Sequence, residues 1–232
     1  MIIHIITYGD KVRKDIIKKQ LKKCDVEYKF HSFEKHSTNE TLGRYTNHFE
    51  LFQYADIHDM EYICVAEDNI NVAYHLTSKI KKEIDSFIKT PDWNVLYLGG
   101  LLPLVCSYKD TSFSSIFQTN SNHGASCYII HKRLYRTLLQ SVVKKDISEC
   151  LYQPNTLQNF ILYPILFHIS PTCTNDKSFV HSLSTTCSSL LQNPSVVKTH
   201  EWFIRYGWLS WPVVISIIII LLLLIYWLCK IV

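Results

Sequence analysis

The C-terminal segment places the strongest constraint on what this chain can fold into. From Trp208 to Cys229 the sequence WLSWPVVISIIIILLLLIYWLC contains no charged residue. At about 1.5 Å per residue, a helix of this length would be about 33 Å long, enough to cross the hydrocarbon core of a bilayer. Trp208 and Trp211 at one end, and two further aromatic residues near the other, are typical of membrane interfaces. We therefore predict a transmembrane helix over residues 208–229.

The N-terminal stretch predicts on which side of the membrane the chain lies. The segment MIIHIITYGDKVRK has too short an apolar run for a signal peptide, and no basic segment precedes that run. We therefore expect a single-pass C-terminal membrane anchor, a tail anchor, with the bulk of the chain in the cytosol. The eight cysteines form no CxxC pair, which excludes the usual zinc-ribbon and redox motifs and fits reduced thiols in that compartment.

The sequence before the anchor divides into a structured part and a connecting part. Residues 1–170 alternate between short apolar runs and segments with helical spacing, which predicts an α/β sandwich with a mostly parallel sheet. Residues 171–207 are rich in Ser and Thr, and we expect them to form a lid and a linker. A loop is expected at 101–122. The expected strands are 2–7, 26–33, 62–66, 94–98 and 126–130, and the expected helices are 11–23, 41–55, 79–89 and 131–143.

Composition and motifs exclude several classes of function. The formal net charge of +4 is small and spread along the chain, which argues against a nucleic-acid partner. The sequence contains no GxGxxG, Walker A, HExxH or GxSxG motif, so most familiar nucleotide-binding and hydrolase classes are excluded. In an α/β sheet, ligands bind at the carboxyl ends of strands, and the residues that follow each expected strand are therefore the first candidates for a site.

The tripeptide Glu67-Asp68-Asn69 directly follows a buried apolar strand. Two adjacent carboxylates repel each other there, and a divalent cation such as Mg²⁺ or Mn²⁺ relieves that repulsion while leaving coordination positions for a substrate diphosphate. Taken alone, the tripeptide also fits a solvated strand end. Glu67 itself is expected either to orient Asp68 or its ligands, or to form a salt bridge with a neighbouring lysine.

Five segments in order give the chain a resemblance to a known family. They are Ile5–Arg13 (IITYGDKVR), Leu42–Phe52 (LGRYTNHFELF), Val65–Ile70 (VAEDNI), Val95–Gly99 (VLYLG) and Gly124–Leu139 (GASCYIIHKRLYRTLL). Their order and spacing resemble those of glycosyltransferase family 25, which includes lipooligosaccharide and collagen galactosyltransferases. The resemblance covers about residues 2–140.

This resemblance implies a GT-A-like nucleotide-diphospho-sugar transferase fold and a metal-assisted, inverting transfer of a hexose. The donor would be a UDP-sugar of galactose or glucose, the metal Mn²⁺ or Mg²⁺, and the acceptor a glycan, lipid or protein. The donor-binding residues would be Thr7, Tyr8, Arg13, Asn47, His48 and Gly99. The metal ligands would be Asp68 and Asn69, with His123 as a third candidate, and the catalytic acids would be Asp68 and Asp146, the latter as acceptor base.

The sequence departs from the family pattern at three positions. Asn69 replaces an aspartate, Asn47 replaces a serine, and Gly43-Arg44 replaces Gly-Glu. Two alternatives therefore stand beside the enzyme: a catalytically inactive glycosyltransferase-fold membrane protein that binds a glycan or nucleotide, and a membrane-bound scaffolding protein that has no site. The lysine-rich helix 11–23 is expected to be a solvated face or a contact with an anionic membrane surface.

Overall fold

The chain forms a mixed α/β fold in the computed structural model. The structure describes residues 1–35, 39–72, 76–99, 108–109, 111–119, 124–141, 146–152, 158–163 and 165–169. The expected lid and linker at 171–207, the expected anchor at 208–229 and His123 lie outside these residues. Among the helices that the structure describes, none is long and apolar enough to cross a membrane.

Fifteen elements follow one another along the described residues. The helices are α1 (Lys11–Lys23), α2 (Glu40–Ile57), α3 (Ser78–Phe87), α4 (Lys132–Gln140) and α5 (Ile147–Leu151). The strands are β1 (Ile2–Thr7), β2 (Glu27–Ser32), β3 (Tyr62–Glu67), β4 (Ile70–Val72), β5 (Val95–Gly99), β6 (Tyr108–Lys109), β7 (Ile116–Thr119), β8 (Cys127–His131), β9 (Asn159–Leu162) and β10 (Phe167–Ile169).

All the strands belong to one mixed sheet. Its main path runs β2-β1-β3-β8-β5-β9-β7-β6, and β10 pairs with β4 and β5 beside this path. The prediction of a mostly parallel sheet is wrong, because β8 runs antiparallel to both β3 and β5 in the middle of the sheet. Strands buried on both faces read as continuous apolar runs in either direction, so the sequence pattern does not give their orientation.

The segment expected as a loop at 101–122 contains two strands. β6 and β7 form an antiparallel pair, and β7 pairs in turn with β9. These strands are short and their segment is rich in Ser and Thr, so no clear alternation of apolar residues marks them in the sequence.

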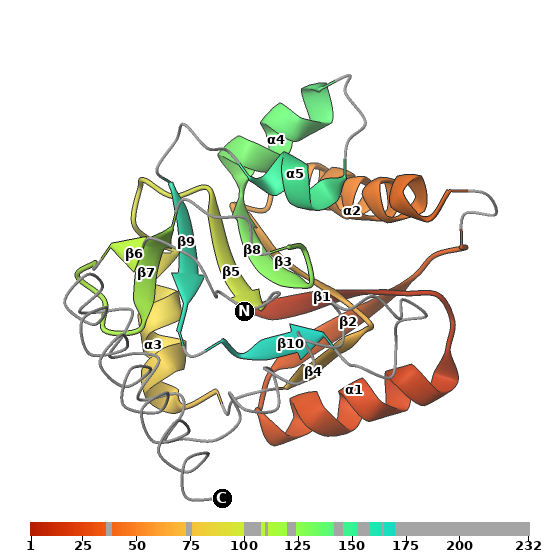
Figure 1. Ribbon diagram of the computed structural model, residues 1–232, viewed down its shortest axis with the longest axis horizontal. Coiled ribbons are helices and arrows are strands. Elements are labelled where there is room, and N and C mark those ends of the chain that lie inside the picture. The colour runs from red at the N-terminus through yellow and green to blue at the C-terminus, as the bar shows by residue number, and fades with distance from the viewer. Residues whose placement is uncertain are drawn as a thin grey trace, which may run out of the picture.

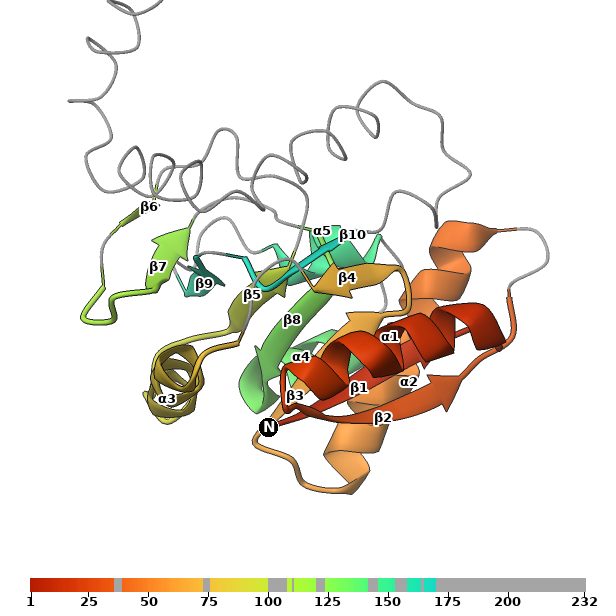
Figure 2. The same cartoon turned by 90° about the horizontal axis from the view of Figure 1, so that it is seen from below.

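Helices cover both faces of the sheet, which confirms the predicted sandwich (Figures 1 and 2). One core cluster joins α1 and α3 to alternate strand residues such as Ile3, Ile5 and Cys64. The other joins α2, α4 and α5 to the intervening strand residues, such as Ile6 and Val65. Because successive side chains of a strand point to opposite faces, the end of each strand can reach residues from both helical layers.

The N-terminus of α1 is fixed next to the carboxyl end of β1. The Asp10 side chain accepts hydrogen bonds from the backbone N–H groups of Val12 and Arg13 at 2.9 and 3.1 Å. A side chain of this type satisfies the N–H groups that the first turn of a helix leaves open. The cap begins the helix at Lys11, as predicted, and places Arg13 in its first turn.

Gly99 ends β5 in close contact with β10. A Cβ atom at Gly99 would lie 2.6 Å from the carbonyl oxygen of Phe167 and 2.8 Å from its Cβ atom. The absence of a side chain at Gly99 is therefore accounted for by the approach of the protein's own strand. A contact of Gly99 with a donor sugar stays a prediction.

We expect Gly99→Ala to lower the free energy of unfolding by about 1–3 kcal/mol, because β5 or β10 must move to admit the methyl group. Urea unfolding followed by tryptophan fluorescence measures the change. Ser86→Ala on the exposed face of α3 is the control, with an expected change of less than about 0.5 kcal/mol. Equal stability of the two variants would contradict the close approach.

Candidate functional site

A charged cluster occupies the carboxyl ends of β1 and β3, between the two helical layers. Glu67, the last residue of β3, contacts side chains of α2. Asp68, the next residue, contacts Arg13 of α1. Since α1 and α2 lie on opposite faces of the sheet, the two adjacent acids are directed to different helical layers. The cluster gathers Tyr8, Arg13, Arg44, Asn47, His48, Glu67, Asp68, Asn69, Tyr128 and Asp146.

Glu67 is the best-connected acid of this cluster. The Nε and Nη2 atoms of Arg44 donate to its Oε1 atom at 2.9 and 2.7 Å, and Asn69 Nδ2 donates to its Oε2 atom at 3.1 Å. Burial alone would raise the pKa of Glu67, but the hydrogen bond from His48 and the charge of Arg44 outweigh it and lower the pKa from 4.5 to about 2. The charge of Glu67 raises the pKa of Arg44 in return. This pair is therefore ionised at neutral pH.

His48 connects Glu67 to the sheet. Its Nε2 atom lies 3.3 Å from Glu67 Oε1, and its Nδ1 atom lies 2.7 Å from the hydroxyl of Tyr128 on β8. Burial lowers the pKa of His48, against the opposing effect of Glu67. A neutral imidazole with its hydrogen on Nε2 satisfies both contacts, because it donates to the carboxylate and accepts from the tyrosine hydroxyl.

Asp68 forms a looser set of contacts on the other face. Its carboxylate lies 3.4 Å from Arg13 Nη1 and accepts from the backbone N–H of Tyr8 at 3.4 Å. The Asp68 side chain is 3% exposed, whereas that of Arg13 is 26% exposed. Asn47 Nδ2 donates to the hydroxyl of Tyr8 at 3.1 Å, and burial raises the pKa of that hydroxyl. Of the predicted donor residues, Tyr8 and Arg13 thus contact the predicted metal ligand Asp68, and Asn47 contacts Tyr8.

Several oxygen atoms at these strand ends are buried without a hydrogen-bond partner among the described residues. They are Thr7 Oγ1 at the end of β1, Asn69 Oδ1 after β3 and Ser126 Oγ before β8. Ser126 and Glu67 are neighbours, since the N–H of Glu67 donates to the carbonyl of Ser126 at 3.0 Å. A buried polar atom without a partner is costly, and here three of them occur at one edge of the sheet.

A divalent cation at this site would have few protein ligands. In the described part of the chain, no group of three or more His, Cys, Asp and Glu side chains is placed to hold a metal. Asp68 and the oxygen of Asn69 are hard ligands of the kind that Mg²⁺ and Mn²⁺ accept, and such ions often take only one or two protein ligands beside substrate phosphates. The residues present therefore fit a cation that arrives with a diphosphate.

Asp146 lies at the border of the cluster. It caps α5, where its Oδ1 atom accepts from the N–H of Ser148 at 2.8 Å. Its Oδ2 atom is 4.0 Å from Arg44 Nη1, and its side chain is 27% exposed. The structure thus brings Asp146 next to the cluster.

Arg44 and Tyr128 belong to the cluster but were not expected as site residues. Glu67 pairs with Arg44 and not with the expected lysine. It contacts the side chain of Asn69 rather than that of Asp68. Helical spacing offers a signal for Arg44, since positions 44, 47 and 48 share one face of α2. Tyr128 gives no such signal, because its role depends on the pairing of β8 with β3.

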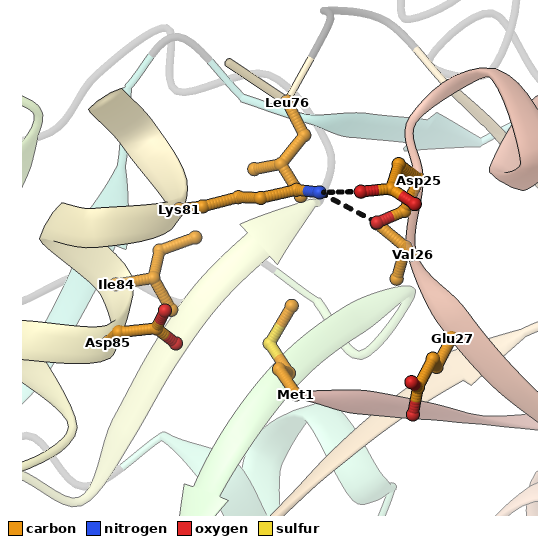
Figure 3. Close-up of a pocket in the computed structure, with 8 residues that line it drawn as sticks. All are labelled: Met1, Asp25, Val26, Glu27, Leu76, Lys81, Ile84 and Asp85. Atoms are coloured by element: carbon orange, nitrogen blue, oxygen red, sulfur yellow. Dashed lines mark hydrogen bonds and ion pairs between the residues drawn. The ribbon is translucent and has the colours of Figure 1, made fainter. Parts of the chain in front are cut away.

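A pocket of about 190 Å³ lies elsewhere, at the amino ends of β1 and β2 (Figure 3). Its lining residues are Met1, Asp25, Val26, Glu27, Leu76, Lys81, Ile84 and Asp85. Lys81 Nζ donates to the carbonyl of Asp25 at 2.6 Å and to its carboxylate at 3.0 Å. None of the predicted site residues lines this pocket, and the candidate site is therefore the charged cluster at the opposite ends of the strands.

Comparisons with known proteins give similarity in fold only. No protein-family model matches the chain, and no curated protein matches it in sequence. Among solved structures, the chain is similar to a glycosyltransferase involved in the glycosylation of the major capsid of PBCV-1, with 11% identity, a TM-score of 0.44, and coverage of 81% of this chain and 98% of the other.

Two further solved structures have comparable similarity. A197 from STIV shares 13% identity, with a TM-score of 0.42 and coverage of 69% of this chain and 80% of that one. The inositol-1-phosphate CTP transferase from T. maritima shares 13% identity, with a TM-score of 0.36 and coverage of 83% and 76%. Since all three TM-scores lie below 0.5, the geometry of the charged cluster carries the argument about function.

We expect Glu67→Gln to lower the free energy of unfolding at pH 7 by about 3 kcal/mol, because it leaves the partly buried Arg44 with only the more distant carboxylate of Asp146, at 4.0 Å, as a counter-charge. The lowered pKa of Glu67 means that its charge stabilises the fold fully above pH 4.5 and progressively less as the pH falls toward 2. The stability difference between wild type and variant should therefore shrink over that range.

Urea unfolding at a series of pH values measures this difference. Glu50→Gln is the matched control, because it removes an exposed carboxylate from α2, the helix that carries Arg44. Its stability should differ little from that of wild type at any pH. A Glu67→Gln penalty that stays constant from pH 7 to pH 3 would contradict the assigned charge state.

Proposed function

We propose that this chain is a membrane-anchored glycosyltransferase that transfers a hexose from a UDP-sugar to a glycan, lipid or protein acceptor. The observation that carries the proposal is the cluster at the carboxyl ends of β1 and β3. There, Asp68 and two arginines lie beside buried oxygen atoms of Thr7 and Asn69 that have no partner among the described residues. The anchor would be the apolar segment 208–229, with the bulk of the chain in the cytosol.

The α1 side of the cluster would hold the donor. Arg13 lies in the first turn of α1, where the helix dipole favours a negative charge. Its contact with Asp68 is long, at 3.4 Å, so a donor diphosphate can compete for the guanidinium group. Tyr8, whose ring packs with the α2 layer and whose hydroxyl is held by Asn47 of that helix, would present its ring to the nucleoside from the opposite side.

A divalent cation would be held by Asp68 and Asn69. When bound, Mn²⁺ or Mg²⁺ neutralises negative charge that develops on the leaving diphosphate. The protein's own part is to orient these two ligands and to supply the positive charge of Arg13 beside them.

Asp146 is the proposed base for the acceptor hydroxyl. Its Oδ1 atom is used in the cap of α5, which leaves Oδ2 to accept the proton. Arg44 Nη1, at 4.0 Å from that oxygen, would orient the carboxylate. A positioned base of this kind typically contributes a factor of about 10² to 10⁴ to the rate.

We expect Asp68→Asn to abolish metal-dependent donor cleavage while leaving the protein folded. The full chain, purified in detergent micelles, is incubated with a panel of UDP- and GDP-sugars and Mn²⁺, and release of the nucleoside diphosphate is recorded beside the thermal unfolding midpoint. Asp92→Asn, at an exposed loop position, is the matched control and should retain full release. Release that persists in Asp68→Asn would contradict the assigned role of Asp68.

A second candidate function is a binding module without turnover. The observation that favours it is the use of both acids within the protein, Glu67 by Arg44 and Asp68 by Arg13. Such a module would be stabilised by a UDP-sugar, since a ligand that binds only the folded state raises the unfolding midpoint. Stabilisation without release of the diphosphate, with every acceptor class supplied, would favour the module over the enzyme.

A further inference from the structure

The side-chain amide of Asn69 is held in one orientation by Glu67. The Oε2 atom of Glu67 lies 3.1 Å from the amide nitrogen of Asn69. The Oε1 atom of the same carboxylate receives two hydrogen bonds from Arg44 and one contact from His48. An ionised carboxylate accepts hydrogen bonds and donates none, so the nitrogen of the amide must face Glu67. The Asn69 carbonyl oxygen is thereby turned away from it.

The oxygen that is turned away has no partner. Asn69 Oδ1 is buried and makes no hydrogen bond to the described residues. Buried polar atoms in native proteins nearly always have a partner, and each exception requires an explanation. Asn69 directly follows Asp68 in the chain, and the Asp68 carboxylate faces Arg13 and the N–H of Tyr8. Asn69 Oδ1 can only accept, which limits its ligand to a cation or a hydrogen-bond donor.

We propose that Glu67, fixed by Arg44 and His48, is a positioning residue that holds Asn69 as an obligate oxygen ligand for the divalent cation. The inference rests on the proposed function and deepens it. In this chain the asparagine donates to Glu67 Oε2, whereas an aspartate at position 69 would place a second carboxylate against that atom. The three residues Arg44, Glu67 and Asn69 form one unit, which we call the amide clamp.

The amide clamp predicts the opposite of what the charge of the ligand alone would suggest. For an isolated ligand, Asn69→Asp adds a negative charge and should strengthen the binding of a cation. In the clamp, the same change replaces a hydrogen bond with a repulsion between carboxylates. Loss of a partner that orients a metal ligand typically weakens metal affinity by about 10–100-fold, and we expect a loss in that range for Asn69→Asp and for Glu67→Gln.

The double variant Glu67→Gln with Asn69→Asp restores the contact with its direction reversed. The amide of the new glutamine can donate to the new aspartate, so affinity should recover relative to Asn69→Asp alone. Asn71→Asp is the matched control. The Oδ1 atom of Asn71 accepts from Gln20 at 3.0 Å, and an aspartate keeps that contact, so this variant should respond to the metal as wild type does.

The test titrates Mn²⁺ into the full chain in detergent micelles with UDP present, and follows the thermal unfolding midpoint. Weaker apparent Mn²⁺ affinity in Asn69→Asp, unchanged affinity in Asn71→Asp and recovery in the double variant support the clamp. Tighter Mn²⁺ binding by Asn69→Asp, or an unchanged affinity, overturns it. If Glu67→Gln does not fold, the comparison of Asn69→Asp with Asn71→Asp still decides.

A measurement without ligand separates the clamp from the proposed function. Urea unfolding of wild type, Glu67→Gln, Asn69→Asp and the double variant, with no metal or nucleotide, reports whether the effects of the two substitutions on stability are coupled. If the two substitutions are coupled but Mn²⁺ does not shift the unfolding midpoint of wild type, the proposed function and the cation as ligand of Asn69 are overturned. The contact between Glu67 and Asn69 is then still supported. Additive effects of the two changes overturn the clamp whatever the metal response.

Discussion

The buried carboxylate of Glu67 is the interaction on which this end of the molecule depends. A charge at the end of a buried strand is tolerated only when it is paired and hydrogen-bonded, and Arg44, His48 and Asn69 together supply those contacts. The same contacts fasten α2 to β3, and His48 continues the chain of contacts to Tyr128 on β8. A single acid thus joins a helix, two neighbouring strands and the turn that follows one of them.

The alternation of side chains along β3 explains why the cluster has two parts. Glu67 follows Val65 toward the layer of α2, and Asp68 lies on the side of Ala66 and α1. The firmly paired acid is on one side, and the loosely paired acid, with contacts of 3.4 Å, is on the other. The division suits a site in which one carboxylate maintains the architecture and its neighbour remains available to a ligand.

The local elements could be predicted from the sequence because their signals are local. Apolar spacing predicts β1 and α1, and both occur at the predicted residues. The direction of β8 and the short strands β6 and β7 could not be predicted, since they depend on which distant segments pair. Likewise, Glu67, Asp68 and Asn69 were found at a strand end, but Arg44 is assigned to Glu67 only once α2 is packed on that strand. The predicted roles of these side chains in binding and catalysis stay predictions, as do those of every other predicted site residue, including Asp146, Gly99 and His123.

The reversed direction of β8 has a consequence for how this protein could diversify. Because β8 is antiparallel to β3 and β5, its first residues lie at the same end of the sheet as the last residues of those strands. Ser126 is thereby placed against Glu67. A substitution at position 126 would therefore change what lies against Glu67, while the pairing of β8 with β3 and β5 is made by the residues that follow it.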